Sequence, residues 1–108
     1  MLIRRDALDR AGLFDTAFFM YGEDIDLCWR IRKAGYNNYY LPDVRITHFK
    51  GQSALQDEES SLRHFYGAMK IFASKHMSPG WHIPVKAGVT LIESGALISF
   101  RIRRLINK

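Results

Sequence analysis

The sequence predicts an α/β chain in which short strands alternate with helices and a long helix forms the C-terminal end. Two patterns indicate the helices: apolar residues recur at three- and four-residue spacing, and acidic and basic residues gather at opposite ends of the same segments. A third pattern, short runs rich in β-branched and aromatic residues beside turn residues, indicates the strands. The chain has 108 residues, 47% of them apolar, which suits one domain or part of one.

The first third of the chain is predicted to hold one strand and two helices. Met1–Arg4 is an apolar strand, and Asp6–Ala11 is a short helix that Gly12 ends. Glu23–Ala34 is a longer helix, because it begins with acidic residues, ends in basic ones and is followed by Gly35. Four residues at helical spacing mark its expected packing side: Ile25, Cys28, Trp29 and Arg32.

The rest of the chain is predicted to hold two strands and two helices. Asn38–Leu41 and Val44–Phe49 are the strands, joined by a proline–aspartate turn. Ser60–His76 is a helix with Leu62, Phe65, Met69 and Phe72 along one stripe. A Ser-Pro-Gly break follows, and Pro84–Ile106 is a long apolar helix. We therefore divide the chain into a segment 1–77 and a C-terminal helical segment 78–108.

An acidic stretch from Tyr21 to Arg30 is the strongest local signal. Glu23, Asp24 and Asp26 place three carboxylates within four positions, directly after aromatic residues. One reading is structural, because acidic residues stabilise the first turn of a helix. The other is functional, because a carboxylate beside another carboxylate and apolar rings suits a general base or a metal ligand. The stretch alone leaves both readings open.

A histidine lies about two dozen residues further on. His48 ends the last predicted strand and precedes a loop that contains Gly51 and Ser53. A lone histidine is more often structural than a ligand. The acidic stretch and the histidine together, with a strand pair between them, form a more specific pattern than either one.

Four segments in this order resemble bacterial family-2 glycosyltransferases, near the rhamnosyltransferase-like members. The match covers roughly residues 1–55 and fades after about residue 77. The segments are Ile3-Arg4-Arg5 with Ala7-Leu8, Gly12-Leu13-Phe14-Asp15 with Phe18-Phe19, Gly22 to Arg30 with Gly35-Tyr36, and Pro42 followed by His48-x-x-Gly51-x-Ser53.

The resemblance implies a partial GT-A-type fold and an inverting transfer of sugar from a nucleotide-diphosphate sugar to a glycan or lipid-linked acceptor. Asp24 would be the general base that deprotonates the acceptor hydroxyl, with Glu23 as the second candidate. His48 would complete the site of a Mn²⁺ or Mg²⁺ ion that neutralises the leaving diphosphate. The family-level setting is polysaccharide biosynthesis for the cell envelope, with a leaning towards rhamnose.

Further residues receive roles from their position beside these motifs. Phe19, Met20 and Tyr21 are candidates for acceptor binding, and Lys50 and Ser53 for phosphate binding. Three more suit structural roles: Asp26 as an ion-pair partner of Arg30 four residues on, and Phe18 and Trp29 as core residues.

The donor-binding half of such an enzyme has no counterpart in this sequence. No Asp-x-Asp motif follows a strand, and Asp24-Ile25-Asp26 lies inside a predicted helix, where its two acids point about 200° apart. We therefore predict that the chain is the C-terminal, acceptor-side part of a glycosyltransferase and does not transfer sugar by itself.

The tail from Ile83 to Phe100 is apolar but contains Lys86 and Glu93. A spanning helix usually needs about 20 apolar residues with few charges. We therefore expect an interfacial helix whose basic end meets an anionic membrane. A packing or oligomerisation helix is the main alternative, and a transmembrane element is a further one.

The charge and the cysteine content limit the partners and the cellular location that we expect. The net charge is +5, but residues 1–60 hold eight basic and ten acidic residues, whereas residues 61–108 hold eight basic and one acidic. We exclude nucleic acid as a partner, because the basic residues follow an apolar run and no binding motif appears. A single cysteine allows no internal disulfide and fits a cytoplasmic location, including a peripheral one on the inner membrane face. The main alternative to an enzyme is a non-catalytic, membrane-associated interaction module, and homo-oligomers through exposed strand edges are a further expectation.

Overall fold

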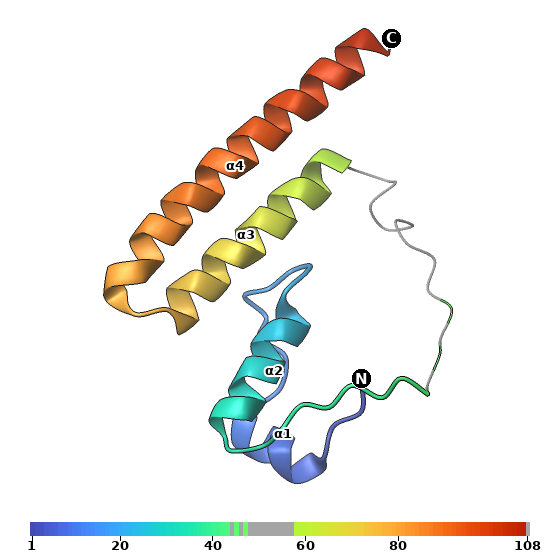
Figure 1. The fold of residues 1–108 in the computed structure, drawn as a ribbon, viewed down its shortest axis with the longest axis vertical. Helices are drawn as coiled ribbons and strands as arrows, with labels where there is room; N and C mark the ends of the chain where they lie inside the picture. Colours follow the sequence, from blue (N-terminus) through green and yellow to red (C-terminus); the bar gives the residue numbers. More distant parts are fainter. Residues whose placement is uncertain (44, 46, 48–57, 108) are drawn as a thin grey trace.

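Two pairs of helices make up the part of the chain that the computed structural model describes, residues 1–43, 45, 47 and 58–107 (Figure 1). The helices are α1 (Arg5–Ala11), α2 (Glu23–Lys33), α3 (Glu58–His76) and α4 (Pro79–Ile106). α1 packs on α2, and α3 packs on α4, so each pair joins neighbours in the sequence. The start of α2 meets the middle of α3, where Gly22 approaches Ala68.

The predicted α/β class is wrong, because the described residues contain no strand. Met1–Arg4 was expected to be a strand, but its residues lead into α1 without one, and Asn38–Leu41 is likewise irregular. A strand needs a neighbouring strand to satisfy its backbone hydrogen bonds, and neither segment has one among the described residues. Val44–Phe49 lies mostly outside the described residues. The described part of the chain therefore lacks the sheet of the expected partial GT-A-type fold.

The four predicted helices are confirmed, each with one boundary changed. α1 begins one residue earlier, at Arg5, and α2 ends one residue earlier, at Lys33. α3 begins at Glu58 rather than Ser60, which places two acidic residues in its first turn. α4 begins at Pro79 rather than Pro84, so the predicted break is confined to Met77 and Ser78. The Ser78 carbonyl accepts hydrogen bonds from the amides of Trp81, at 2.9 Å, and His82, at 3.1 Å. Proline at the first helical position suits this start.

The buried core is small and lies between α1, α2 and α3. Its members are Ala7, Phe18, Asp26, Leu27, Ile31, Ala68 and Ala73. Phe18 is buried as predicted. Trp29, predicted to be core, is 42% exposed, and Ile25 is 60% exposed, so the fully buried side of α2 is not the one that the spacing favoured.

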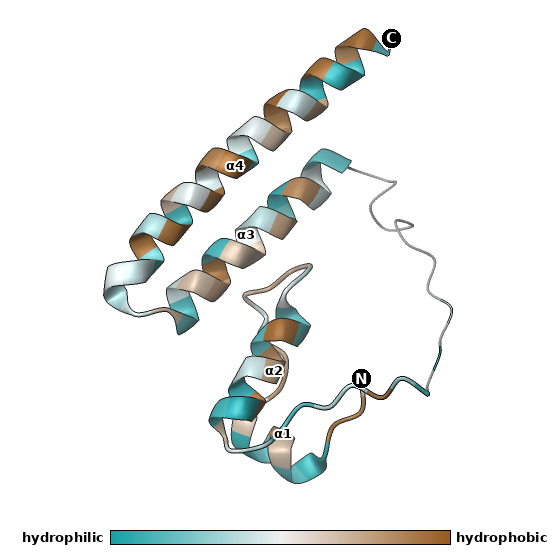
Figure 2. Cartoon of the chain, viewed as in Figure 1, coloured by the Kyte–Doolittle hydropathy of each residue, from teal (hydrophilic) through white to brown (hydrophobic). Residues whose placement is uncertain are grey.

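Much apolar surface is left uncovered. The accessible surface is 8892 Å², whereas a compact monomer of 12.5 kDa is expected to expose about 6,200 Å². The radius of gyration is 16.9 Å, against about 13 Å for a compact domain of this length. Leu2, Tyr39 and Tyr40 are each more than 80% exposed, and α4 carries hydrophobic residues along its length (Figure 2). By length and composition alone, α4 is the one described helix that could cross a membrane.

Candidate functional site

A tight turn places the acidic stretch at the start of α2. Tyr21 and Gly22 both have left-handed backbone angles, with φ of 68° and 81°. Such a conformation costs a non-glycine residue about 1–3 kcal/mol, and it is found most often at functional sites. A Cβ on Gly22 would lie 3.3 Å from the Ala68 Cβ, so the turn also packs closely on α3. Glu23 and Asp24 follow this turn directly.

The two candidate bases have different surroundings. The Asp24 side chain is exposed, and its Oδ1 accepts a hydrogen bond of 2.8 Å from the Ile25 amide. Glu23 is half-buried, and its Oε2 is buried without a hydrogen-bond partner in the described part of the chain. Asp24 is therefore the more accessible carboxylate. Accessibility matters here because a base must come within hydrogen-bond reach of the group that it deprotonates.

Asp26 lies on the opposite side of α2 and is fully buried. Its Oδ2 accepts a hydrogen bond of 2.8 Å from Arg30 Nε, which confirms the predicted ion pair. Its Oδ1 lies 2.6 Å from Nε2 of His76, at the end of α3, and 3.7 Å from Lys75 Nζ. Burial raises the pKa of the Asp26 carboxyl, but the hydrogen bonds from His76 and Arg30 outweigh it and hold the pKa below its usual value. Asp26 thus joins α2 to the end of α3.

The same cluster fixes the segment between α1 and α2. The Arg30 guanidinium donates to the Ala11 carbonyl and, at 2.8 Å, to the Leu13 carbonyl. Lys75 pairs with Asp15 in the same segment. We call Asp15, Asp26, Arg30, Lys75 and His76 the Asp26 ion cluster. Sequence reasoning missed His76, Lys75 and Asp15, because a basic helix end carries no signal for a partner 50 or 60 residues away.

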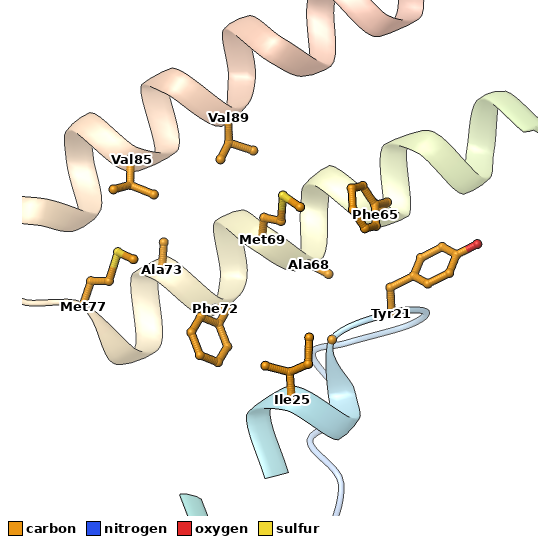
Figure 3. A pocket seen from close by; sticks show the side chains of 11 residues that line it. Tyr21, Ile25, Phe65, Ala68, Met69, Phe72, Ala73, Met77, Val85 and Val89 are labelled. Carbon is orange, nitrogen blue, oxygen red and sulfur yellow. The ribbon is translucent and has the colours of Figure 1, made fainter. Parts of the chain in front are cut away.

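An apolar pocket of about 320 Å³ lies beside the start of α2, between α2, α3 and α4 (Figure 3). Tyr21 stands at its edge, with its ring edge-on to Phe65 at 5.9 Å. The pocket is lined by Tyr21, Gly22, Ile25, Phe65, Ala68, Met69, Phe72, Ala73, Met77, Val85 and Val89. Its lining fits a hydrocarbon group rather than a polar one.

The three predicted acceptor-binding residues face two different hollows. Tyr21 lines the apolar pocket, whereas Phe19 and Met20 border a smaller hollow of about 90 Å³ against α3. The Phe19 ring packs on His64 with 4.8 Å between ring centroids. The structure therefore brings these residues to the start of α2 but not into one cavity.

The predicted metal and phosphate ligands His48, Lys50 and Ser53 lie outside the described residues. Within the described ranges, no three His, Cys, Asp or Glu side chains gather as a metal site. Asp26 is turned towards cations of its own chain and is not available as a ligand. The described residues therefore do not form a site for the Mn²⁺ or Mg²⁺ ion that the resemblance implies.

Comparisons with known proteins find a family match that includes the acidic stretch. Residues 1–67 match the model of the glycosyltransferase like family 2. The chain is 33% identical over 107 residues to the N-acetylglucosaminyl-diphospho-decaprenol L-rhamnosyltransferase of Mycobacterium tuberculosis, covering 96% of this chain and 35% of the relative. It is 43% identical over 49 residues to the rhamnosyltransferase WbbL of Escherichia coli, covering 45% of this chain and 19% of that protein. It is also 29% identical over 100 residues to a pre-mycofactocin glycosyltransferase of M. tuberculosis, covering 93% and 19%.

The chain thus spans about a third, or less, of the length of these relatives. No solved structure matches it. The family match nevertheless includes both helices of the first pair, the acidic stretch and the first part of α3. The chain belongs to glycosyltransferase family 2 and is rhamnosyltransferase-like.

Proposed function

We propose that this chain is the acceptor-side part of an inverting glycosyltransferase that moves a sugar from a nucleotide-diphosphate sugar to a glycan or lipid-linked acceptor. The relatives support this, since two of them are named rhamnosyltransferases and one name includes a decaprenol-linked substrate. The observation that carries the proposal is the position of Asp24. Its exposed carboxylate follows a strained turn and lies two residues from Gly22, which lines the apolar pocket.

In the proposed reaction, the Asp24 carboxylate takes the proton of an acceptor hydroxyl. The acceptor oxygen forms a bond to the anomeric carbon as the bond from that carbon to the diphosphate oxygen breaks on the opposite face. The configuration inverts, and the nucleoside diphosphate leaves with the electron pair. Glu23 is the second candidate for the base, and Tyr21, Phe19 and Met20 would contact the acceptor.

The divalent ion, Mn²⁺ or Mg²⁺, belongs to the complete enzyme in this proposal. Because the described residues form no metal site, no step above passes through it. A ligand role for His48 and phosphate contacts from Lys50 and Ser53 rest on the family resemblance.

We further propose that the isolated chain does not transfer sugar, and that the complete enzyme works in the cytoplasm, on the inner face of the membrane. The M. tuberculosis rhamnosyltransferase is about three times as long, and the exposed side chains of Leu2, Tyr39 and Tyr40 suit contact with a further part of such an enzyme. The competing function is a non-catalytic, membrane-associated module. The exposed apolar surface of α4 supports this alternative, because such a helix could bind a membrane without any sugar transfer.

A chimera tests the proposal. The matching region of the M. tuberculosis rhamnosyltransferase is replaced by this chain, and release of nucleoside diphosphate is measured with the relative's donor and acceptor. Asp24→Asn should lower kcat by about 10²–10⁴-fold with little change in the donor KM. Asp9→Asn, an exposed acid on α1, is the control and should stay within twofold.

Other outcomes would assign the role of the base to another residue or favour the competing function. A fully active Asp24→Asn chimera would remove Asp24 from the mechanism, and a loss confined to Glu23→Gln would make Glu23 the base. A chimera that folds, binds donor and transfers no sugar would favour the non-catalytic module.

A further inference from the structure

We propose that α4 binds the surface of an anionic lipid bilayer through its outward face and lies in the plane of the membrane. The outward face is the side turned away from α3, defined by Leu91, Ile98, Ile102 and Leu105. The proposal concerns a binding surface, so its test is independent of whether the chain takes part in sugar transfer.

The outward face is apolar and uncovered. Its four residues follow one another at spacings of seven, four and three, which places them on one side of a helix. They are 50–75% exposed. The opposite side of α4 is used inside the chain, because Val85 and Val89 line the apolar pocket against α3. α4 therefore has two apolar sides, and only one has a partner in the described chain.

The charges of α4 avoid the outward face over most of its length. Lys86 and Glu93 lie about 140° and 160° around the helix axis from Leu91. Glu93, the one acidic residue of α4, is paired with Lys70 of α3 at 2.6 Å. The uncharged side is thus much wider than the narrow seam that a two-helix coiled coil requires, and its width suits a lipid surface.

The basic end of the helix selects an anionic surface. Residues 94–108 hold four basic residues and no acidic one. Arg103 and Arg104 are exposed in the last turn of α4, about 120° and 140° around the axis from Leu91, and their long side chains can reach the lipid headgroups. A basic residue close to an anionic bilayer strengthens binding by roughly fivefold. A second copy packed in parallel would instead bring two arginine clusters together.

The packing of α3 favours a helix that lies flat rather than one that spans. α3 runs along α4 and is tied to it by the Lys70–Glu93 pair and by a Glu59–Arg101 pair at 2.7 Å. A spanning α4 would have to break these contacts or carry the charges of α3 into hydrocarbon, which is costly. In the flat position, the outward face enters the interface and α3 stays on the aqueous side.

Vesicle flotation of the full 108-residue chain tests the proposal. The probes are phosphatidylcholine vesicles and vesicles with 30% phosphatidylglycerol, at low and high salt. Trp29→Phe leaves Trp81, at the start of α4, as a single fluorescent reporter. We expect binding to the anionic vesicles, a blue shift of Trp81 emission and release at high salt.

Two matched pairs of variants locate the surface. Ile98→Glu should weaken binding at least tenfold, whereas Ser74→Glu, the same charge change on exposed α3, should stay within threefold. Arg103→Gln with Arg104→Gln should weaken binding to anionic vesicles roughly 30-fold. Arg4→Gln with Arg5→Gln removes the same charge at the distant α1 and should have a much smaller effect.

Circular dichroism of each variant checks that it folds. Three results would overturn the proposal: no binding to anionic vesicles, equal effects of Ile98→Glu and Ser74→Glu, or a stable dimer that Ile98→Glu dissociates. Retention in vesicles at high salt, with α4 parallel to the membrane normal in oriented circular dichroism, would replace the flat helix with a spanning one.

Discussion

Replacing Asp26 with alanine should destabilise the chain far more than any exposed ion pair does. Asp26 has no solvent exposure, and the side chains of its partners Arg30 and His76 are only 21% and 7% exposed. Alanine removes the acceptor of both hydrogen bonds and leaves two donors without a partner inside the structure. Breaking a buried ion pair by removing one member costs about 3–5 kcal/mol.

The expected loss is about 3 kcal/mol, at the lower end of that range, because Arg30 keeps some contact with water. For a chain of this size, that corresponds to a fall of roughly 12–24 °C in the melting temperature. The assay is unfolding by heat and by urea, followed by circular dichroism. The control is Asp9→Ala, which breaks a pair with Arg5 whose side chains are 60% and 89% exposed and should cost less than about 0.5 kcal/mol.

A double-mutant cycle identifies the contact responsible. Asp26→Ala and His76→Ala together should cost at least about 1 kcal/mol less than the sum of the two single changes, because they remove one shared interaction. If Asp26→Ala were no more damaging than Asp9→Ala, the Asp26 ion cluster would not hold α2 to α3, and the junction would depend on other contacts.

Three further predictions concern pH, backbone and surface charge. The folded-state pKa of Asp26 is lowered, so the stabilisation that its carboxylate provides is full above about pH 4 and is lost as the pH falls through the folded-state pKa. Acid unfolding should show this loss of stability, and Asp26→Asn should remove this pH dependence. Gly22→Ala should cost about 1–3 kcal/mol in thermal unfolding, because φ is +81° and Ala68 is close, whereas Gly67→Ala in open helix should gain up to about 1 kcal/mol. Arg101 and Arg63 hold the pKa of Glu59 at about 2, and an NMR titration should find it substantially higher in Arg101→Gln.

Local patterns were sufficient to locate the helices. The Glu23–Ala34 prediction ends one residue past α2, because terminal charges and Gly35 mark its limits within a few residues of sequence. The predicted strand Asn38–Leu41 failed for the opposite reason. A strand depends on hydrogen bonds from a distant partner, and no property of four residues reports whether that partner is present.

In the candidate site, too, contacts between residues close in sequence were predictable, whereas contacts that depend on helix packing were not. Tyr21, Glu23 and Asp24 come together because they lie within four positions of the sequence, and the Asp26–Arg30 pair follows from helix spacing. His76 was not predictable, because α3 must first pack on α2 to bring it within reach of Asp26. The buried side of α2 was misjudged for the same reason: spacing groups Ile25 with Trp29 but does not say which side the rest of the chain covers.

The arrangement of the helices in two neighbouring pairs has a consequence for folding kinetics. Within each pair, α1 with α2 and α3 with α4, contacts are local in sequence, so each pair should form quickly. The junction between the pairs is thinner and depends on contacts such as Asp26–His76, which close a loop of 50 residues. Native-state hydrogen exchange should therefore resolve two cooperative units, and the pairs should separate at a lower free energy than either needs to unfold.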